Sequence, residues 1–127
     1  METLFGEYFK QLREKRGLSL RSFCITNGFD PGNISRLERG TFLAPESQGK
    51  LREYAKALGL TEGSTEWIEF FDKAAASRGM IPHDLHKEED LVRRLPLLFR
   101  TLRGQRLSSD ALDKVVELVR DSDSHGE

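Results

Sequence analysis

The chain has 127 residues, of which 37% are hydrophobic and 32% are charged, so a helical core can form beneath a strongly charged surface. The net charge of −1 is unevenly divided, since residues 1–60 hold ten Lys or Arg and seven Asp or Glu (+3), whereas residues 61–127 hold ten and fourteen (−4). Neither a run of about 18 uncharged apolar residues nor a signal-peptide core occurs, so we expect a cytoplasmic protein with no membrane contact.

The first predicted element is an amphipathic helix over residues 3–16. Phe5, Phe9 and Leu12 lie four and then three residues apart, which places them on one side of a helix. We expect this apolar side to pack behind the segment that follows it.

Residues 19–27 predict the first of two short helices. Ser19 follows the breaker Gly17 and is a good N-cap, because its hydroxyl can accept a free N–H of the first turn. The helix is expected to end at about Asn27, where Gly28 stops it.

A second short helix is predicted directly after a tight turn. Asp30 followed by Pro31 is a start signal, because Asp caps free N–H groups and Pro fits the first helical turn. Gly40 closes the helix as a left-handed C-cap. Only Ile34 and Leu37 form an apolar face, so the polar side chains of this helix are left to point elsewhere.

The second helix ends in the run Ile34-Ser35-Arg36-Leu37-Glu38-Arg39-Gly40. This pattern resembles the recognition helix of the lambda-repressor-like, or XRE-type, helix-turn-helix regulators of bacteria and phages. The resemblance extends from about Phe5 to about Leu60. It implies an all-α fold with a five-helix DNA-binding domain, to which the later residues add a C-terminal helical extension, and it implies that Arg13 and Glu38 form an ion pair across the core.

Two positions depart from the pattern of that family. Leu20 stands at the start of the first helix, where relatives often place a polar residue that contacts DNA. Gly32 supplies no side chain where many relatives place a residue that reads a base. Fewer side chains are therefore expected to read bases, and part of the specificity is expected to come from DNA shape.

Two more helices are predicted to complete the domain. Residues 47–58 show helical spacing of apolar residues and are ended by Gly59, and residues 64–77 form a fifth helix. The fifth helix carries four large apolar residues, Trp67, Ile68, Phe70 and Phe71, which are too many for one exposed helix. Most of them are therefore expected to cover the core.

The breaker sequence Arg78-Gly79-Met80-Ile81-Pro82 predicts the main boundary of the chain. Residues 1–78 are interpreted as an XRE-type helix-turn-helix DNA-binding domain and residues 79–127 as a helical extension. Residues 88–103 predict one helix of the extension, broken or kinked at Pro96. A last helix, capped by Ser108 or Ser109, is expected to end near residue 120, before a frayed polar tail over 121–127.

The two helices of the extension carry apolar residues that they cannot bury by themselves, because fewer than about 40 residues rarely form an independent core. We therefore predict that the extension dimerises or binds a partner, with wrapping of its own N-terminal domain as the alternative. The apolar residues at helical spacing are Leu91, Leu95, Leu98, Phe99, Leu102, Leu112, Val115, Val116 and Val119.

The exposed side of the second short helix is the predicted DNA-reading surface. Arg36 is the main candidate, because an arginine can grip a guanine through O6 and N7. The predicted base contacts are Pro31, Gly32, Asn33 and Arg36. The predicted phosphate contacts, which position the protein without reading sequence, are Ser19, Leu20, Arg21, Asn33, Arg39, Gly40 and Thr41.

The hypothesis that follows is a sequence-specific dimeric repressor that binds a palindromic site in double-stranded DNA. The alternative is an antitoxin or mobile-element regulator whose acidic C-terminal half binds a toxin or a regulatory protease.

Enzymatic signatures are missing from the sequence. There is no Gly-rich phosphate loop and no recognisable nucleophile, and a single cysteine, Cys24, excludes a disulfide framework or a cysteine-clustered zinc site. His83 and His86 are three residues apart, a spacing common by chance, and are interpreted as loop or cap residues. No catalytic activity, cofactor or metal is expected.

Overall fold

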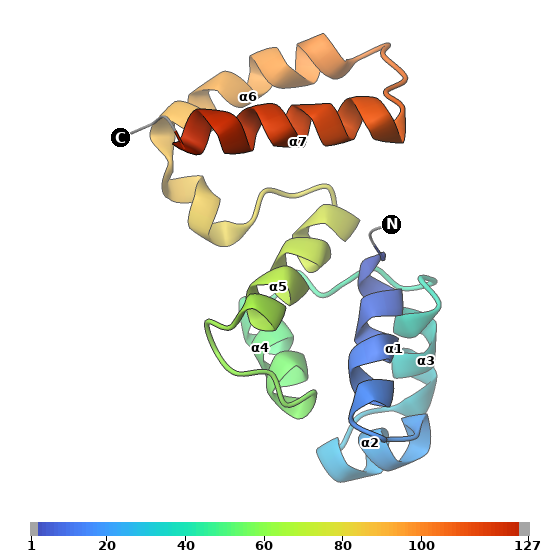
Figure 1. Cartoon of the computed structure of the whole chain (residues 1–127). Coiled ribbons are helices and arrows are strands. Elements are labelled where there is room, and N and C mark those ends of the chain that lie inside the picture. The colour runs from blue at the N-terminus through green and yellow to red at the C-terminus, as the bar shows by residue number, and fades with distance from the viewer. Residues whose placement is uncertain (1–2, 125–127) are drawn as a thin grey trace. The chain divides into compact units, whose positions relative to one another are not determined.

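The computed structural model describes residues 3–124, and every regular element within that range is a helix (Figure 1). The predicted all-α class is therefore confirmed. The α-helices are α1 Phe5–Lys15, α2 Leu20–Asn27, α3 Pro31–Glu38, α4 Gln48–Ala57, α5 Thr65–Ser77, α6 Glu89–Leu102 and α7 Ser109–Ser124, and a 3-10 turn, η1, spans His83–Lys87. Among the described helices, none combines the length and the apolar content needed to cross a bilayer.

The chain forms two compact units, Met1–Lys87 and Glu88–Glu127. The sequence places the boundary after Arg78, whereas the structural division follows Lys87. Residues 80–86 stay with the first unit because they lie beside α4 and α5, where several of them line a shared pocket.

The first unit is built around aromatic side chains from four helices. Phe9 of α1, Phe23 of α2 and Phe70 of α5 are fully buried, and the Phe9 and Phe23 rings meet edge to face with centroids 5.8 Å apart. Tyr54 of α4 packs against Phe9 at 5.5 Å. Burial of these large apolar surfaces is the main source of stability for the unit.

Local signals set the geometry of the α2–α3 pair. The Ser19 hydroxyl accepts the backbone N–H of Ser22 at 3.0 Å, and Oδ2 of Asp30 accepts the N–H of Asn33 at 2.8 Å. Gly28 ends α2 with a φ of +71°, a left-handed conformation that favours glycine. The predicted caps of both helices are confirmed.

A close crossing of α1 and α3 holds α3 in place, and the sequence gives little sign of it. Gly6 of α1 is buried, and a Cβ at this position would lie against the carbonyl oxygen of Leu37 and 2.7 Å from that of Glu38. These are backbone atoms, so they cannot move aside as a flexible side chain would. Only glycine allows α1 to approach the end of α3 this closely.

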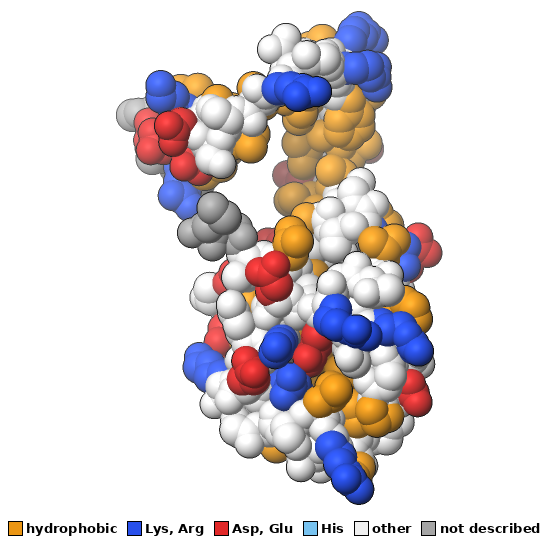
Figure 2. Space-filling view, turned by 90° about the vertical axis from the view of Figure 1, so that its right-hand side faces the viewer, with side chains coloured by type: hydrophobic (Ala, Val, Ile, Leu, Met, Phe, Trp, Pro, Cys, Tyr) orange, Lys and Arg blue, Asp and Glu red, His pale blue; other side chains and the backbone are white. Residues whose placement is uncertain are grey.

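The second unit is a helical hairpin in which α6 and α7 run antiparallel (Figure 1). Helix α6 has no buried residue, and large apolar side chains remain exposed on both helices, for example Leu98 at 47% and Val116 at 47%. Figure 2 shows hydrophobic side chains on the surface of this unit. The hairpin therefore does not bury its own apolar surface.

The predicted end of the last helix near residue 120 is wrong, and of the break or kink predicted at Pro96 the structure contradicts the break. Helix α6 continues through Pro96 without a break, because a proline removes one backbone hydrogen bond and the turns on either side of it keep theirs. Helix α7 continues to Ser124, so residues 121–124 are helical and not a frayed tail. Residues 125–127 lie outside the described part of the chain.

Candidate nucleic-acid interface

The C-terminal end of α3 is fixed to α1 by a buried ion pair. Nε and Nη2 of Arg13 donate to the two carboxylate oxygens of Glu38 at 2.8 and 2.9 Å, and Nη1 donates to the carbonyl oxygen of Leu18 at 2.8 Å. The hydrogen bond to Glu38 raises the pKa of Arg13 above its ordinary value, so the guanidinium group stays charged. One side chain thus joins α1, the α1–α2 turn and α3.

This anchoring leaves α3 with two different sides. Ile34, Leu37 and Glu38 are buried against the rest of the unit. The other side is exposed and carries the predicted contacts Pro31, Asn33, Arg36 and Arg39, with Gly32 half-buried between them. The structure therefore brings the predicted base-contacting residues together on one open surface.

Arg36 is held in a defined position on that surface. Its Nη1 donates to Oδ1 of Asn33 at 3.2 Å, and its Cζ atom lies 5.4 Å from the centroid of the Phe42 ring. A Cβ at Gly32 would lie 3.4 Å from the same Nη1 atom, so the guanidinium group lies over this glycine. The side-chain carbonyl oxygen of Asn33 thus binds Arg36, the main candidate for reading a base.

Phe42 is the residue of this surface that the sequence analysis did not single out. It lies beside Arg36 because Gly40, with a φ of +79°, turns the chain back over the end of α3. The N–H groups of Thr41 and Phe42 both donate to the carbonyl oxygen of Arg36, at 2.9 and 3.2 Å. The one available signal was the predicted left-handed glycine, which reverses the chain just before an aromatic residue.

The predicted phosphate contacts lie at both flanks of α3. At the start of α2, Ser19 uses its hydroxyl as a cap, whereas the N–H groups of Leu20 and Arg21 lie in the first turn, which lacks intrahelical partners. The Leu20 side chain packs against the core, so only its backbone can contact a phosphate. Arg21 is exposed.

On the other flank, Nε of Arg39 donates to the carbonyl oxygen of Ser35 at 3.3 Å, and the side chain stays exposed. Gly40 and Thr41 are also exposed. Because the Thr41 N–H already binds Arg36, its hydroxyl is the group left for a phosphate. The two flanks thus offer N–H, hydroxyl and guanidinium donors, which are the groups that proteins use on DNA phosphates.

Comparison with protein families matches this part of the chain. A model described as a helix-turn-helix domain covers residues 4–68, just over half of the chain and all of α1 to α4. The chain belongs to the helix-turn-helix domain family. The predicted family resemblance is thereby confirmed, and a helix-turn-helix domain is a DNA-binding module. No curated protein and no solved structure matches the chain.

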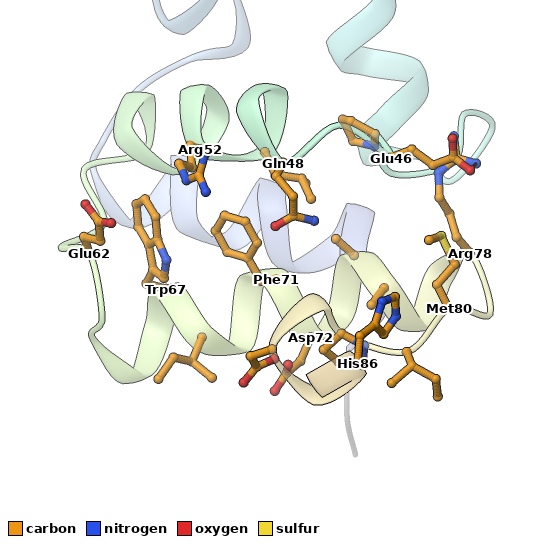
Figure 3. A pocket seen from close by; sticks show the side chains of 18 residues that line it. Glu46, Gln48, Arg52, Glu62, Trp67, Phe71, Asp72, Arg78, Met80 and His86 are labelled. Carbon is orange, nitrogen blue, oxygen red and sulfur yellow. Dashed lines mark ion pairs between the residues drawn. The ribbon is translucent and has the colours of Figure 1, made fainter. Parts of the chain in front are cut away.

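A pocket of about 390 Å³ lies elsewhere on the helix-turn-helix unit, between α4, α5 and residues 80–86 (Figure 3). Trp67 and Phe71 extend from α5 toward α4, with ring centroids 5.2 Å apart. Burial, and then the charge of Asp84, raises the pKa of Asp72 at this pocket. None of the predicted DNA-contacting residues lines it, and in the described part of the chain no group of His, Cys, Asp and Glu side chains could hold a metal ion.

Proposed function

We propose that the chain is a sequence-specific transcriptional regulator that binds palindromic DNA as a dimeric repressor. The observation that carries the proposal is the exposed side of α3, where Asn33 and Arg36 stand on a helix anchored by the Arg13–Glu38 pair. A helix-turn-helix domain places such a helix in the major groove, where base pairs are distinguishable by their hydrogen-bonding groups.

In this proposal Arg36 reads a guanine, and the smaller residues before it allow a close approach. Pro31 contacts a thymine methyl group, Gly32 lets the helix backbone approach the base edges, and Asn33 supports Arg36 while its amide group contacts DNA. A bidentate arginine–guanine contact contributes about 1 to 3 kcal/mol of discrimination against a wrong base.

The phosphate contacts supply affinity without sequence preference. The proposed set is Ser19, Leu20, Arg21, Asn33, Arg39, Gly40 and Thr41. Each cationic contact releases condensed counterions, so affinity is expected to fall steeply as salt rises. The excess of positive charge in residues 1–60 supports a DNA contact by this half of the chain.

The α6–α7 hairpin is proposed to pair with the hairpin of a second copy. Two copies of the same apolar side can meet across a two-fold axis, and the two hairpins would then make a four-helix bundle that buries both sides. The proposed interface consists of Leu91, Leu95, Leu98, Phe99, Leu102, Leu112, Val115, Val116 and Val119, all exposed or half-buried in the single chain. The dimer would present two α3 helices to half-sites about 34 to 36 Å apart.

The test is to capture fragments of the source genome on the purified full-length protein at near-physiological salt, sequence them, and measure the mass of the complex by sedimentation. A palindrome bound by a dimer supports the proposal. Arg36→Ala is expected to lose the enrichment while the fold is kept, and Arg52→Ala, which removes an exposed arginine from α4, is the matched control. Unchanged base preference in a folded Arg36→Ala protein would refute the assignment of the reading surface.

A monomer that carries another protein through purification would instead favour the alternative function. In that case the apolar side of the hairpin binds a toxin or a regulatory protease, and autoregulation through the helix-turn-helix domain becomes the secondary role.

A further inference from the structure

The arrangement around Arg36 leaves one particular edge of its guanidinium group open. Nη1 is bound to Asn33 and the Phe42 ring lies at the cation–π distance of 5.4 Å, whereas no described residue accepts a hydrogen bond from Nε or Nη2. The same two donors of Arg13, Nε and Nη2, bind the two oxygens of Glu38 within this chain. The open edge of Arg36 is therefore a ready bidentate donor.

We propose that Phe42 is a positioning residue for base reading, which holds the Arg36 guanidinium so that its Nε–Nη2 edge meets a guanine already oriented. This inference rests on the proposed function, in which Arg36 reads a base. Phe42 itself touches the arginine and need not touch a base. The guanine class of target follows from the geometry, because O6 and N7 of guanine accept two parallel hydrogen bonds from one arginine.

The physical reason is the cost of ordering a long side chain. A free arginine samples many rotamers, and fixing them when DNA binds reduces the affinity that the new hydrogen bonds supply. In this chain two contacts restrict the arginine before DNA arrives, a hydrogen bond at one nitrogen and a ring at one face. Preorganisation of this kind favours the matched base, because the mismatched base gains nothing from an oriented donor pair.

Phe42 is suited to this role because it does little for the core. It is 44% exposed and is not one of the residues packed in the hydrophobic core. Its backbone is fixed independently of its ring, through the N–H bond to the carbonyl oxygen of Arg36. Its neighbour Leu43 is also large, apolar and exposed, at 58%, but it makes no cation–π contact with Arg36. Leu43 is therefore a matched control.

The experiment selects a randomised double-stranded DNA library on the full-length wild type and on Arg36→Ala, Phe42→Ala, Phe42→Leu, Phe42→Trp and Leu43→Ala. The preferred base that Arg36→Ala erases identifies the position read by the arginine. At that position we expect Phe42→Ala and Phe42→Leu to lower the preference about 2- to 5-fold, and Phe42→Trp and Leu43→Ala to keep it. Affinity for a shuffled duplex should be unchanged in every Phe42 variant.

A second measurement follows the contact between Arg36 and the Phe42 ring itself, in the absence of DNA. The Arg36 Nε–H resonance in a spectrum of the ¹⁵N-labelled protein should feel the ring current of Phe42, and should shift in Phe42→Ala and Phe42→Leu but not in Leu43→Ala. Thermal unfolding of each variant shows whether the fold is kept. Phe42→Leu retains an apolar side chain without a ring, so it keeps the inference testable if Phe42→Ala unfolds.

The outcomes separate the inference from the proposed function. If Arg36→Ala erases a base preference that Phe42→Leu leaves intact, the positioning role of Phe42 is overturned while the reading role of Arg36 stands. Equal weakening on matched and shuffled DNA by Phe42→Leu also overturns it, because that is the behaviour of a phosphate contact. If Arg36→Ala keeps every preference, or the wild type selects no sequence, the reading assignment fails first and the role of Phe42 fails with it.

Discussion

Replacing Glu38 by glutamine should show how much the buried ion pair that anchors α3 contributes to the stability of the first unit. The Arg13 and Glu38 side chains are only 7% and 6% exposed, so the substitution leaves a buried guanidinium without its counter-charge. Removing one partner of a buried pair costs about 3 to 5 kcal/mol. A glutamine oxygen can keep one of the two bonds, while its NH₂ group faces another donor, so we expect about 3 kcal/mol, at the lower end of this range.

The assay is urea unfolding followed by the fluorescence of Trp67, the only tryptophan of the chain. Trp67 is buried in the same unit as the ion pair, so its signal reports on that unit. A loss of about 3 kcal/mol should lower the urea midpoint by about 1 to 3 M, since the slope for small proteins is about 1 to 3 kcal/mol/M.

Glu66→Gln is the matched control for this substitution. It breaks the ion pair between Lys15 and Glu66, which measures 3.2 Å and joins side chains that are 72% and 47% exposed. An exposed pair of this kind contributes about 1 kcal/mol or less. The double variant Arg13→Met with Glu38→Leu should recover most of the lost stability, because neither charge is then stranded. A midpoint shift for Glu38→Gln no larger than that for Glu66→Gln would show that the buried pair stabilises the unit no more than an exposed one.

Three further substitutions test other features. Gly6→Ala should destabilise the first unit by about 2 kcal/mol or more, because the added Cβ would meet backbone atoms. Gly49→Ala is the control, since its Cβ would lie 3.6 Å from its nearest neighbour, and it should be neutral or stabilising by up to about 1 kcal/mol. Thermal unfolding of the two variants distinguishes these outcomes. Burial, and then nearby carboxylates, raises the pKa of Tyr8 to about 12. The stability that the neutral phenol contributes is therefore complete below about pH 10 and is lost as the pH rises toward 12. Over this range the urea midpoint of Tyr8→Phe should fall less than that of the wild type. Leu98→Glu should shift a dimer toward monomer in sedimentation. Leu97→Glu should not, because this residue lies about 100° around the helix from Leu98. Equal effects of the two substitutions would contradict the proposed interface.

Much of the fold could be predicted because its signals are local. Ser19 and Asp30 cap the helices that follow them, and Gly28 and Gly40 adopt the left-handed conformation expected at the ends of α2 and α3. Each depends on backbone groups within three or four residues, so the sequence alone contains both partners of the interaction. At Pro96 a local signal misled, because a proline predicts a break, whereas a helix that keeps its other hydrogen bonds tolerates one missing N–H.

The candidate site could be predicted only in part for the same reason. The exposed polar side of α3 follows from the positions of Ile34 and Leu37, which need no knowledge of other helices. The pairing of Arg13 with Glu38 spans 25 residues, and it came from the family resemblance, not from spacing.

The sequence by itself therefore determined which segments are helical, where the α2–α3 turn lies and which side of α3 is polar, because these depend on periodicity and on capping between near neighbours. The tertiary structure alone decided that α1 crosses α3 closely enough to require Gly6, and that the chain turns back to place Phe42 beside Arg36. Both depend on distances between separate parts of the backbone, which no local pattern of residues specifies.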